Sequence, residues 1–304
     1  MDGEVTGAPA VRDRRVPVDG GSLAVAEYGD PDGPPVLAIH GISASSRSWL
    51  AVARLLPDVR LIAPDLRGRG RSTGFTDRLG LAQHRDDMRA VLDVLGLDRV
   101  VVVGHSMGGF VALPLAAAEP QRVASIVLVD GGLPLAPPPG VDLEDLLALS
   151  PEALLGPAWR RLTTVFPSRE AAAGFWRAHP AFADAWTDDV AAYADYDLEP
   201  VDGGFRPSAD PEAVAVNQKE LFGPPWYRDA LHRVRQPVAV LRAPLGLQAE
   251  PPGLYPPDAL EGFVADVPQL EVVEVPDVNH YTVLMTRPGA DRVAEAVRAA
   301  LDHR

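Results

Sequence analysis

The chain contains no cysteine, and Lys219 is its only lysine among 304 residues. Without cysteine there can be no disulfide, no thiolate nucleophile and no metal site built on sulfur. A signal-peptide pattern is also missing, because residues 1–5 are acidic and lack an apolar segment. No apolar run approaches the length that spans a membrane. We therefore expect a soluble, cytoplasmic protein.

Basic residues are too few to balance the acidic ones. The chain has 28 Lys and Arg against 42 Asp and Glu, which gives a net charge of −14. This charge argues against nucleic acid and against an anionic membrane surface as partners, and it disfavours a strongly anionic substrate. The hydrophobic fraction of 47% is ample for a sizeable core. The length suits one large α/β domain with an insertion, or two small domains.

Short apolar runs alternate along the chain with segments that have helical periodicity. In the segment 79–96, for example, Leu81, Met88 and Val91 fall on one face of a helix. The predicted strands are 22–28, 35–39, 59–63, 100–103, 123–129, 238–241 and 271–275, and helices are predicted over 49–56, 79–96 and 288–302. Such alternation indicates an α/β fold with a mostly parallel sheet covered by helices on both faces.

The alternation is interrupted after residue 132. Prolines 137–139 mark a linker, and the segment that follows is helical in pattern with no clear buried strand. We therefore predict a helical cap over 133–233, inserted into a core domain made of 15–132 and 234–304. Residues 1–14 are polar and small, and we expect a flexible tail there.

The most specific motif is the segment Gly104 to Gly109, which reads G-H-S-M-G-G between two apolar stretches. The pattern G-x-S-x-G between a strand and a helix is the nucleophile elbow. Its turn is so sharp that small residues must flank the serine, here Gly104 and Gly108. The turn lifts the Ser106 hydroxyl above the sheet edge and directs the N-terminus of the next helix at the reacting centre.

Other segments complete a recognisable order: His40-Gly41, then Pro64-Asp65-Leu66-Arg67-Gly68-Arg69-Gly70-Arg71-Ser72, then the elbow, then Asn279-His280. With these motifs the chain resembles the α/β-hydrolase family from about residue 15 to 302. The resemblance implies a mostly parallel central sheet flanked by helices, with an inserted helical cap. It also implies the chain order nucleophile, acid, histidine, and chemistry that needs no cofactor and no metal.

A serine hydroxyl is a poor nucleophile until a base takes its proton, and a histidine suits that role. Among seven histidines, His280 follows the last predicted strand, which is the family's position for the base. We predict that Ser106 and His280 are catalytic. His40 is interpreted as structural, and so is the corner formed by Asp65 and the arginine-rich loop after it.

The acid that orients the histidine has two candidates. The resemblance implies a position after the strand 238–242, but the only carboxylate that follows there is Glu250. A minority of relatives place the acid after the preceding strand, where this chain has Asp130 followed by two glycines. We predict Asp130, with Glu250 as the alternative.

The attacked carbonyl becomes an oxyanion, which needs two preorganised N–H donors. We predict the backbone N–H groups of Met107, the residue after the nucleophile, and of Ile42, in the loop that follows His40. Ser43 is the alternative to Ile42.

The substrate pocket is predicted to be apolar, because the cap region is rich in aromatic residues. We expect the pocket to include Trp159, Trp176, Trp186, Tyr193 and Trp226. The predicted function is a serine hydrolase that cleaves a carboxylic ester or lactone of a hydrophobic small molecule through an acyl-enzyme. A C–C bond hydrolase or thioesterase would use the same parts, and a non-catalytic small-molecule receptor is the alternative of another class. The sequence indicates no oligomeric state.

Overall fold

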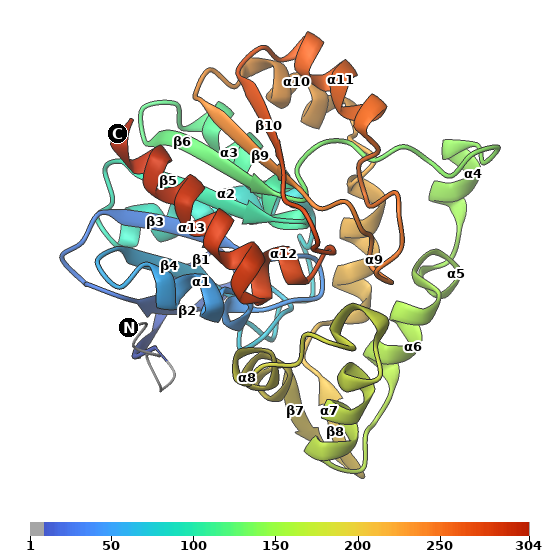
Figure 1. The fold of residues 1–304 in the computed structure, drawn as a ribbon. Coiled ribbons are helices and arrows are strands. Elements are labelled where there is room, and N and C mark those ends of the chain that lie inside the picture. Colours follow the sequence, from blue (N-terminus) through green and yellow to red (C-terminus); the bar gives the residue numbers. More distant parts are fainter. Residues whose placement is uncertain (1–8, 304) are drawn as a thin grey trace.

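A computed structural model describes residues 9–303 of the chain, and its centre is an eight-stranded sheet (Figure 1). The strand order is β1-β2-β4-β3-β5-β6-β9-β10. The strands from β4 to β10 in this order are parallel to one another, whereas β2 is antiparallel to both β1 and β4. The bounds are β1 Val11–Val18, β2 Gly21–Tyr28, β3 Pro35–Ile39, β4 Arg60–Pro64, β5 Val100–His105, β6 Val123–Val129, β9 Val238–Arg242 and β10 Leu270–Glu274. The predicted fold class is confirmed.

The central strands are buried on both faces, and for this reason they read as continuous apolar runs rather than as alternating ones. Every residue of β5 and β6 is buried, and the register pairs Val102 with Ile126. β-branched side chains such as these pack well on a pleated surface.

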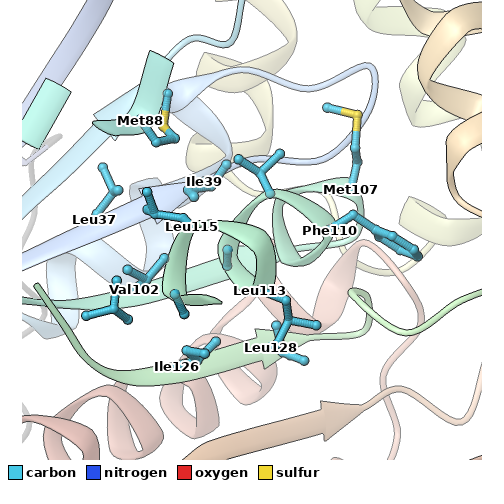
Figure 2. Close-up of a cluster of buried hydrophobic side chains, with 14 of the residues drawn as sticks. Leu37, Ile39, Met88, Val102, Met107, Phe110, Leu113, Leu115, Ile126 and Leu128 are labelled. Carbon is cyan, nitrogen blue, oxygen red and sulfur yellow. The ribbon is translucent and has the colours of Figure 1, made fainter. Parts of the chain in front are cut away.

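Helices cover both faces of the sheet. On one face α3, which is apolar on all sides, lies over β3, β5 and β6, with α2 and α10 beside it. Figure 2 shows the packing on this face, formed by Leu37, Ile39, Met88, Val102, Met107, Phe110, Leu113, Leu115, Ile126 and Leu128. On the other face α1, α12 and α13 share a second core. The bounds are α1 Leu50–Leu55, after the 3-10 turn Ser46–Trp49, then α2 Leu81–Val94, α3 Met107–Ala118, α10 Pro225–Arg233, α11 Pro257–Asp266, α12 Thr282–Met285 and α13 Arg287–Asp302.

A cap of short helices extends from one end of the sheet, after β6 (Figure 1). It is mainly helical, and β7 and β8 form a small antiparallel hairpin within it. The bounds are α4 Leu143–Ala148, α5 Pro151–Leu155, α6 Pro157–Thr163, α7 Arg169–Arg177, the 3-10 turn Pro180–Phe182, α8 Asp188–Tyr196, β7 Leu198–Val201, β8 Gly204–Pro207 and α9 Pro211–Glu220.

Two predicted boundaries are wrong. The expected cap, 133–233, includes α10, but α10 packs on α3, and Tyr227 lies in the core on that face of the sheet. The expected tail, 1–14, includes the start of β1, whose residues pair with β2 from Val11 onward. Residues 1–8, on which the rest of the tail and the signal-peptide prediction fall, lie outside the described residues. Within residues 9–303, no helix combines the length and apolar character needed to cross a membrane.

Candidate active site

The strand β5 ends in the predicted elbow, and Ser106 sits at its tip. Ser106 has a φ of 53°, in the left-handed region that a residue with a side chain rarely adopts. The positions on either side of the serine leave no room for a side chain. A Cβ on Gly104 would lie 2.5 Å from the carbonyl carbon of Gly108, and a Cβ on Gly108 would lie 2.0 Å from the carbonyl oxygen of Ile39. The backbone is packed too closely here for any larger residue, so the turn can form only with glycine at positions 104 and 108.

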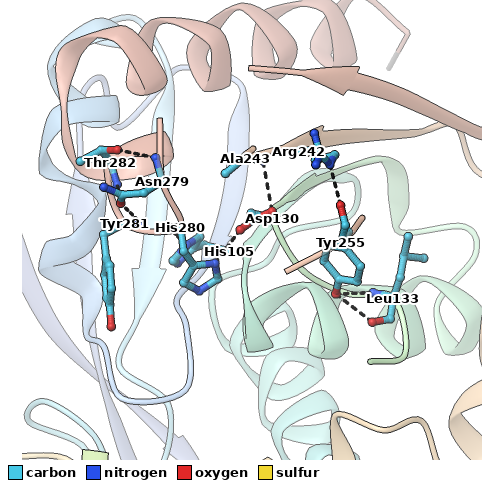
Figure 3. A network of polar contacts seen from close by, with 10 residues as sticks. All are labelled: His105, Asp130, Leu133, Arg242, Ala243, Tyr255, Asn279, His280, Tyr281 and Thr282. Atoms are coloured by element: carbon cyan, nitrogen blue, oxygen red, sulfur yellow. Dashed lines mark hydrogen bonds and ion pairs between the residues drawn. The ribbon is translucent and has the colours of Figure 1, made fainter. Parts of the chain in front are cut away.

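His280 lies in the loop after β10, and its ring is held by Asp130 (Figure 3). The Nδ1 of His280 is 2.6 Å from the Oδ2 of Asp130, and both side chains are buried. His280 and Ser106 line the same cavity. The geometry thus brings the predicted nucleophile, base and acid together at the carboxyl ends of three strands.

Asp130 directly follows β6, with a φ of 44° that turns its side chain toward His280. Its other oxygen, Oδ1, accepts a hydrogen bond of 3.1 Å from the backbone N–H of Ala243. Gly131 must be glycine, because a Cβ there would lie 2.1 Å from the carbonyl oxygen of Ser106. The alternative acid, Glu250, is exposed in the loop after β9, where its backbone carbonyl accepts from Gly246. Asp130, not Glu250, occupies the position beside His280.

His105 braces His280 from the elbow side. Its Nε2 lies 2.8 Å from the backbone carbonyl of His280, so Nε2 carries the proton and donates it. The two rings are tilted, with centroids 4.8 Å apart. Burial lowers the pKa of His105 to about 3, with the neighbouring His280 adding to the effect. His105 is therefore neutral at physiological pH.

The loop after β3 holds Ile42 beside Ser106, in the wall of the same cavity. The Gly41 carbonyl receives a 2.7 Å bond from His40 Nδ1 and a 3.2 Å bond from the N–H of Ala44. Because the N–H and C=O of a trans peptide point in opposite directions, these bonds also fix the direction of the Ile42 N–H. Met107 opens α3, and N–H groups in the first turn of a helix have no acceptor within the helix.

His40 is structural, as interpreted from the sequence. The N–H of Leu66 donates to its Nε2 over 2.9 Å, so the ring proton must sit on Nδ1 and be donated to Gly41. Burial lowers the pKa of His40 to about 4. Asp65 likewise holds the corner it was expected to form, accepting from the N–H groups of Ser46 and Arg71 and from the Tyr196 hydroxyl.

Arg69 has a contact with the site that sequence reasoning missed. Its Nε donates to the carbonyl of Ile42 over 2.9 Å, and its guanidinium also bonds the carbonyl of Arg67 and the side chain of Asn217. Through the Ile42 carbonyl, Arg69 fixes the following peptide and hence the N–H of Ser43, the alternative donor. The motif drew attention to this loop, but no local signal showed which carbonyl the arginine would reach.

The cavity in front of Ser106 has a volume of about 130 Å³ and is mostly apolar. Of the five aromatic residues predicted to line it, only Tyr193 does. Its wall also includes residues of α9 and its C-terminal end, of α12, of the loop after β9 and of the loops around Ser106, namely Gln218, Leu221, Met285, Leu247, Leu254, Ile42, Ser43, Leu135 and Tyr281.

The four predicted tryptophans lie outside this wall. Trp176 is buried among Phe182, Tyr193 and other aromatic rings of the cap. Trp186 stacks under Arg177 and packs on the core around α13. Trp226 lies on α10 against the core around α3, and Trp159 is half-buried on α6. Packing within the cap or against the core accounts for Trp176, Trp186 and Trp226.

No group of three or more histidine, aspartate or glutamate side chains that could hold a metal ion occurs within residues 9–303. Around Ser106, the structure places His280 in the same cavity wall and Asp130 against the His280 ring, which are the residues predicted as nucleophile, base and acid. Such an arrangement is suited to acyl transfer.

Comparisons with known proteins identify the family of this fold. A family model described as alpha/beta hydrolase fold matches residues 34–183. Lipase LipV of Mycobacterium tuberculosis (strain ATCC 25618 / H37Rv) is 39% identical over 169 residues, which cover 55% of this chain and 61% of that protein. The match thus spans less than two thirds of that relative's length.

Two further proteins match over most of their length. The 3-hydroxybutyrate-oligomer hydrolase of Cupriavidus necator is 30% identical over 279 residues, covering 85% of this chain and 86% of that protein. The crystal structure of E-2-(acetamidomethylene)succinate hydrolase superposes with a TM-score of 0.77 and 26% identity, covering 96% of this chain and all of that one. The elbow, the sheet and these matches show that the chain belongs to the α/β-hydrolase family.

Proposed function

We propose that the protein hydrolyses a carboxylic ester of a small, neutral, hydrophobic molecule, with Ser106 as nucleophile, His280 as base and Asp130 as the orienting acid. One observation carries the proposal: His280 Nδ1 lies 2.6 Å from Asp130 Oδ2, and the His280 ring lines the same cavity as Ser106. A carboxylate in this position fixes the tautomer and stabilises the imidazolium that forms during the reaction.

The reaction proceeds in two halves. Ser106 Oγ attacks the ester carbonyl while His280 Nε2 takes its proton, and the carbonyl electrons move onto oxygen to form an oxyanion. The N–H groups of Met107 and Ile42 stabilise that charge. When the intermediate collapses, His280 returns the proton to the departing alcohol. A water molecule, deprotonated by His280, then attacks the acyl-enzyme, and as this second intermediate collapses His280 gives the proton to Ser106 Oγ and the acid is released.

The cavity supports a neutral substrate. Among its described lining residues none is Arg, Lys, Asp or Glu, so a carboxylate in the cavity would have no cationic partner. The net charge of −14 also disfavours the approach of anions. The names of two relatives, a lipase and a 3-hydroxybutyrate-oligomer hydrolase, agree with an ester. A lactone, thioester or C–C bond would use the same three side chains, and relative rates on such substrates decide among them.

Labelling with a serine-reactive fluorophosphonate tests the proposal. We expect one labelled residue, Ser106, and loss of both labelling and ester hydrolysis in Ser106→Ala, with kcat lower by on the order of 10⁴–10⁶. Ser22→Ala, at the start of β2, is the control and should keep both. Retention of most activity in a folded Ser106→Ala protein would rule out this nucleophile, and a folded wild type that neither labels nor turns over any ester would favour the receptor alternative.

A further inference from the structure

One polar side chain in the cavity has no part in the mechanism. Gln218 lies in the third turn of α9, is half-buried, and lines the cavity together with Ser106 and Leu221. Within residues 9–303, no hydrogen bond joins its side-chain amide to another protein group. The amide is therefore open to a substrate, in a wall that is otherwise mostly apolar.

The helix that carries Gln218 is held firmly by its neighbour, Asn217. Asn217 Oδ1 accepts from Arg69 over 2.7 Å and from His84 over 3.1 Å, and its Nδ2 donates to the carbonyl of Leu79 over 2.7 Å. Asn217 is fully buried. Because these bonds fix α9 against the core, the Gln218 amide presents its donor and acceptor from a rigid position, which reduces the entropy lost on binding.

The cavity is also small. A cavity of about 150 Å³ holds a benzene-sized molecule, so the volume of about 130 Å³ here suits a group on the order of five or six heavy atoms. Leu135, Leu221 and Leu254 form part of its apolar wall. A long acyl chain exceeds this volume and would have to extend out of the cavity.

From the amide, the neutral wall and the volume together, we infer that the protein selects esters of short acyl chains that carry a hydroxyl, and that the Gln218 amide binds that hydroxyl. The inference rests on the proposed ester hydrolysis. A wholly apolar chain would strip water from the amide and return no hydrogen bond, and a carboxylate would have no cation to pair with. A hydroxyl matches the amide because each can donate and accept.

Methyl esters test the inference, because methanol is so small that the acyl chain alone can fill the cavity. We expect kcat/KM for methyl 3-hydroxybutyrate to exceed that for methyl butyrate by about 3- to 10-fold in the wild type, the value of one neutral hydrogen bond. In Gln218→Leu, which keeps the size of the side chain, the ratio should fall to about 1. The exposed Gln248, whose side chain contacts His179, provides the control Gln248→Leu, which should keep the wild-type ratio.

Binding to Ser106→Ala protein separates this inference from the proposed function. In a ligand-observed NMR titration, Ser106→Ala should bind methyl 3-hydroxybutyrate more tightly than methyl butyrate, and Ser106→Ala with Gln218→Leu should not. Absence of ester turnover in the wild type would refute the proposed function, while this titration still decides the role of Gln218. Equal binding of the two esters by Ser106→Ala, or a preference that survives Gln218→Leu, would overturn the inference.

Discussion

Asp130 illustrates how a single residue's backbone serves the site. Its φ of 44° is costly for a residue with a side chain, yet that conformation directs one carboxylate oxygen to His280 and the other to the N–H of Ala243. The two glycines that follow made Asp130 the better candidate in the sequence, since they let the chain pass close to other backbone. Gly131 does pass against Ser106, and a Cβ there would overlap it.

We expect Asp130→Asn to lower kcat by about 10² to 10⁴ with little change in KM, because the amide favours the wrong imidazole tautomer and cannot stabilise the imidazolium. Steady-state kinetics on a neutral ester measures the effect. Glu250→Gln is the matched control and should be nearly silent, since Glu250 is exposed and away from His280. A folded Asp130→Asn enzyme with wild-type kcat, or a large loss in Glu250→Gln, would contradict the assignment.

At the scale of elements, three segments meet beside the site: the loop after β3, the loop after β4 and the helix α9. Arg69, in the loop after β4, joins the Ile42 carbonyl to Asn217 on the cap helix α9. Burial lowers the pKa of Arg69 to about 9, so the guanidinium is still charged at neutral pH. The cap is thereby tied to the loop that carries Ile42 and Ser43, the two residues considered as the second oxyanion donor, and we propose that Arg69 positions this loop.

Arg69→Met should lower kcat about 10- to 100-fold with KM changed far less, because a donor that shifts loses part of its stabilisation of the oxyanion. Arg69→Lys should restore part of the activity, since an ammonium can reach one of the three acceptors. The control is Arg85→Met, a surface residue that pairs with Asp86. Thermal unfolding shows whether each protein is folded at the assay temperature. If folded Arg69→Met keeps the wild-type kcat, or if KM alone changes, Arg69 does not position the donors.

Some elements were predictable from the sequence and others were not, for physical reasons. The buried strands β3, β5 and β6 are recognisable in the sequence as apolar runs bounded by turns, and the elbow is recognisable by its glycines. β1 was missed because it is an edge strand, largely exposed and rich in charge, whose pairing with β2 is a property of the sheet and not of its own residues.

The cavity wall was the least predictable part of the site. Large aromatic residues in the cap fit both a pocket and a core, and Trp176 and Trp186 joined the packing between helices. The residues that do form the wall, such as Leu135 and Leu254, come from loops with no pattern of their own. Which of them meet depends on tertiary packing alone.

At the scale of the whole molecule, folding buries three histidines in the neutral state. Burial lowers the pKa of His40 to about 4, that of His105 to about 3, and that of His84 well below its usual value of 6.5. Each ring has a defined hydrogen bond in this state, to Gly41, to the His280 carbonyl and to Asn217 respectively. The unfolded chain therefore binds protons near pH 6.5 that the folded protein does not bind until far lower pH.

The free energy of unfolding should consequently fall as the pH is lowered through the unfolded value of about 6.5. Between about pH 7.5 and about pH 6, each of the three histidines contributes a loss of about 0.8 kcal/mol, or ~2 kcal/mol together. Buried carboxylic acids with raised pKa, such as Asp197 and Glu220, oppose this trend, because they gain protons in the folded state before they do so in the unfolded chain. The lower pH of the comparison is therefore kept near about 6, where most carboxyl groups of the unfolded chain are still ionised.

Urea unfolding at the two pH values measures the difference. His84→Gln removes one titrating ring and keeps a side-chain N–H for Asn217, so its free energy of unfolding should depend less on pH, whatever its absolute stability. The carboxylic acids are the same in both proteins, so a pH dependence that is unchanged in His84→Gln would show that this ring is charged, or exposed to solvent, in the native protein.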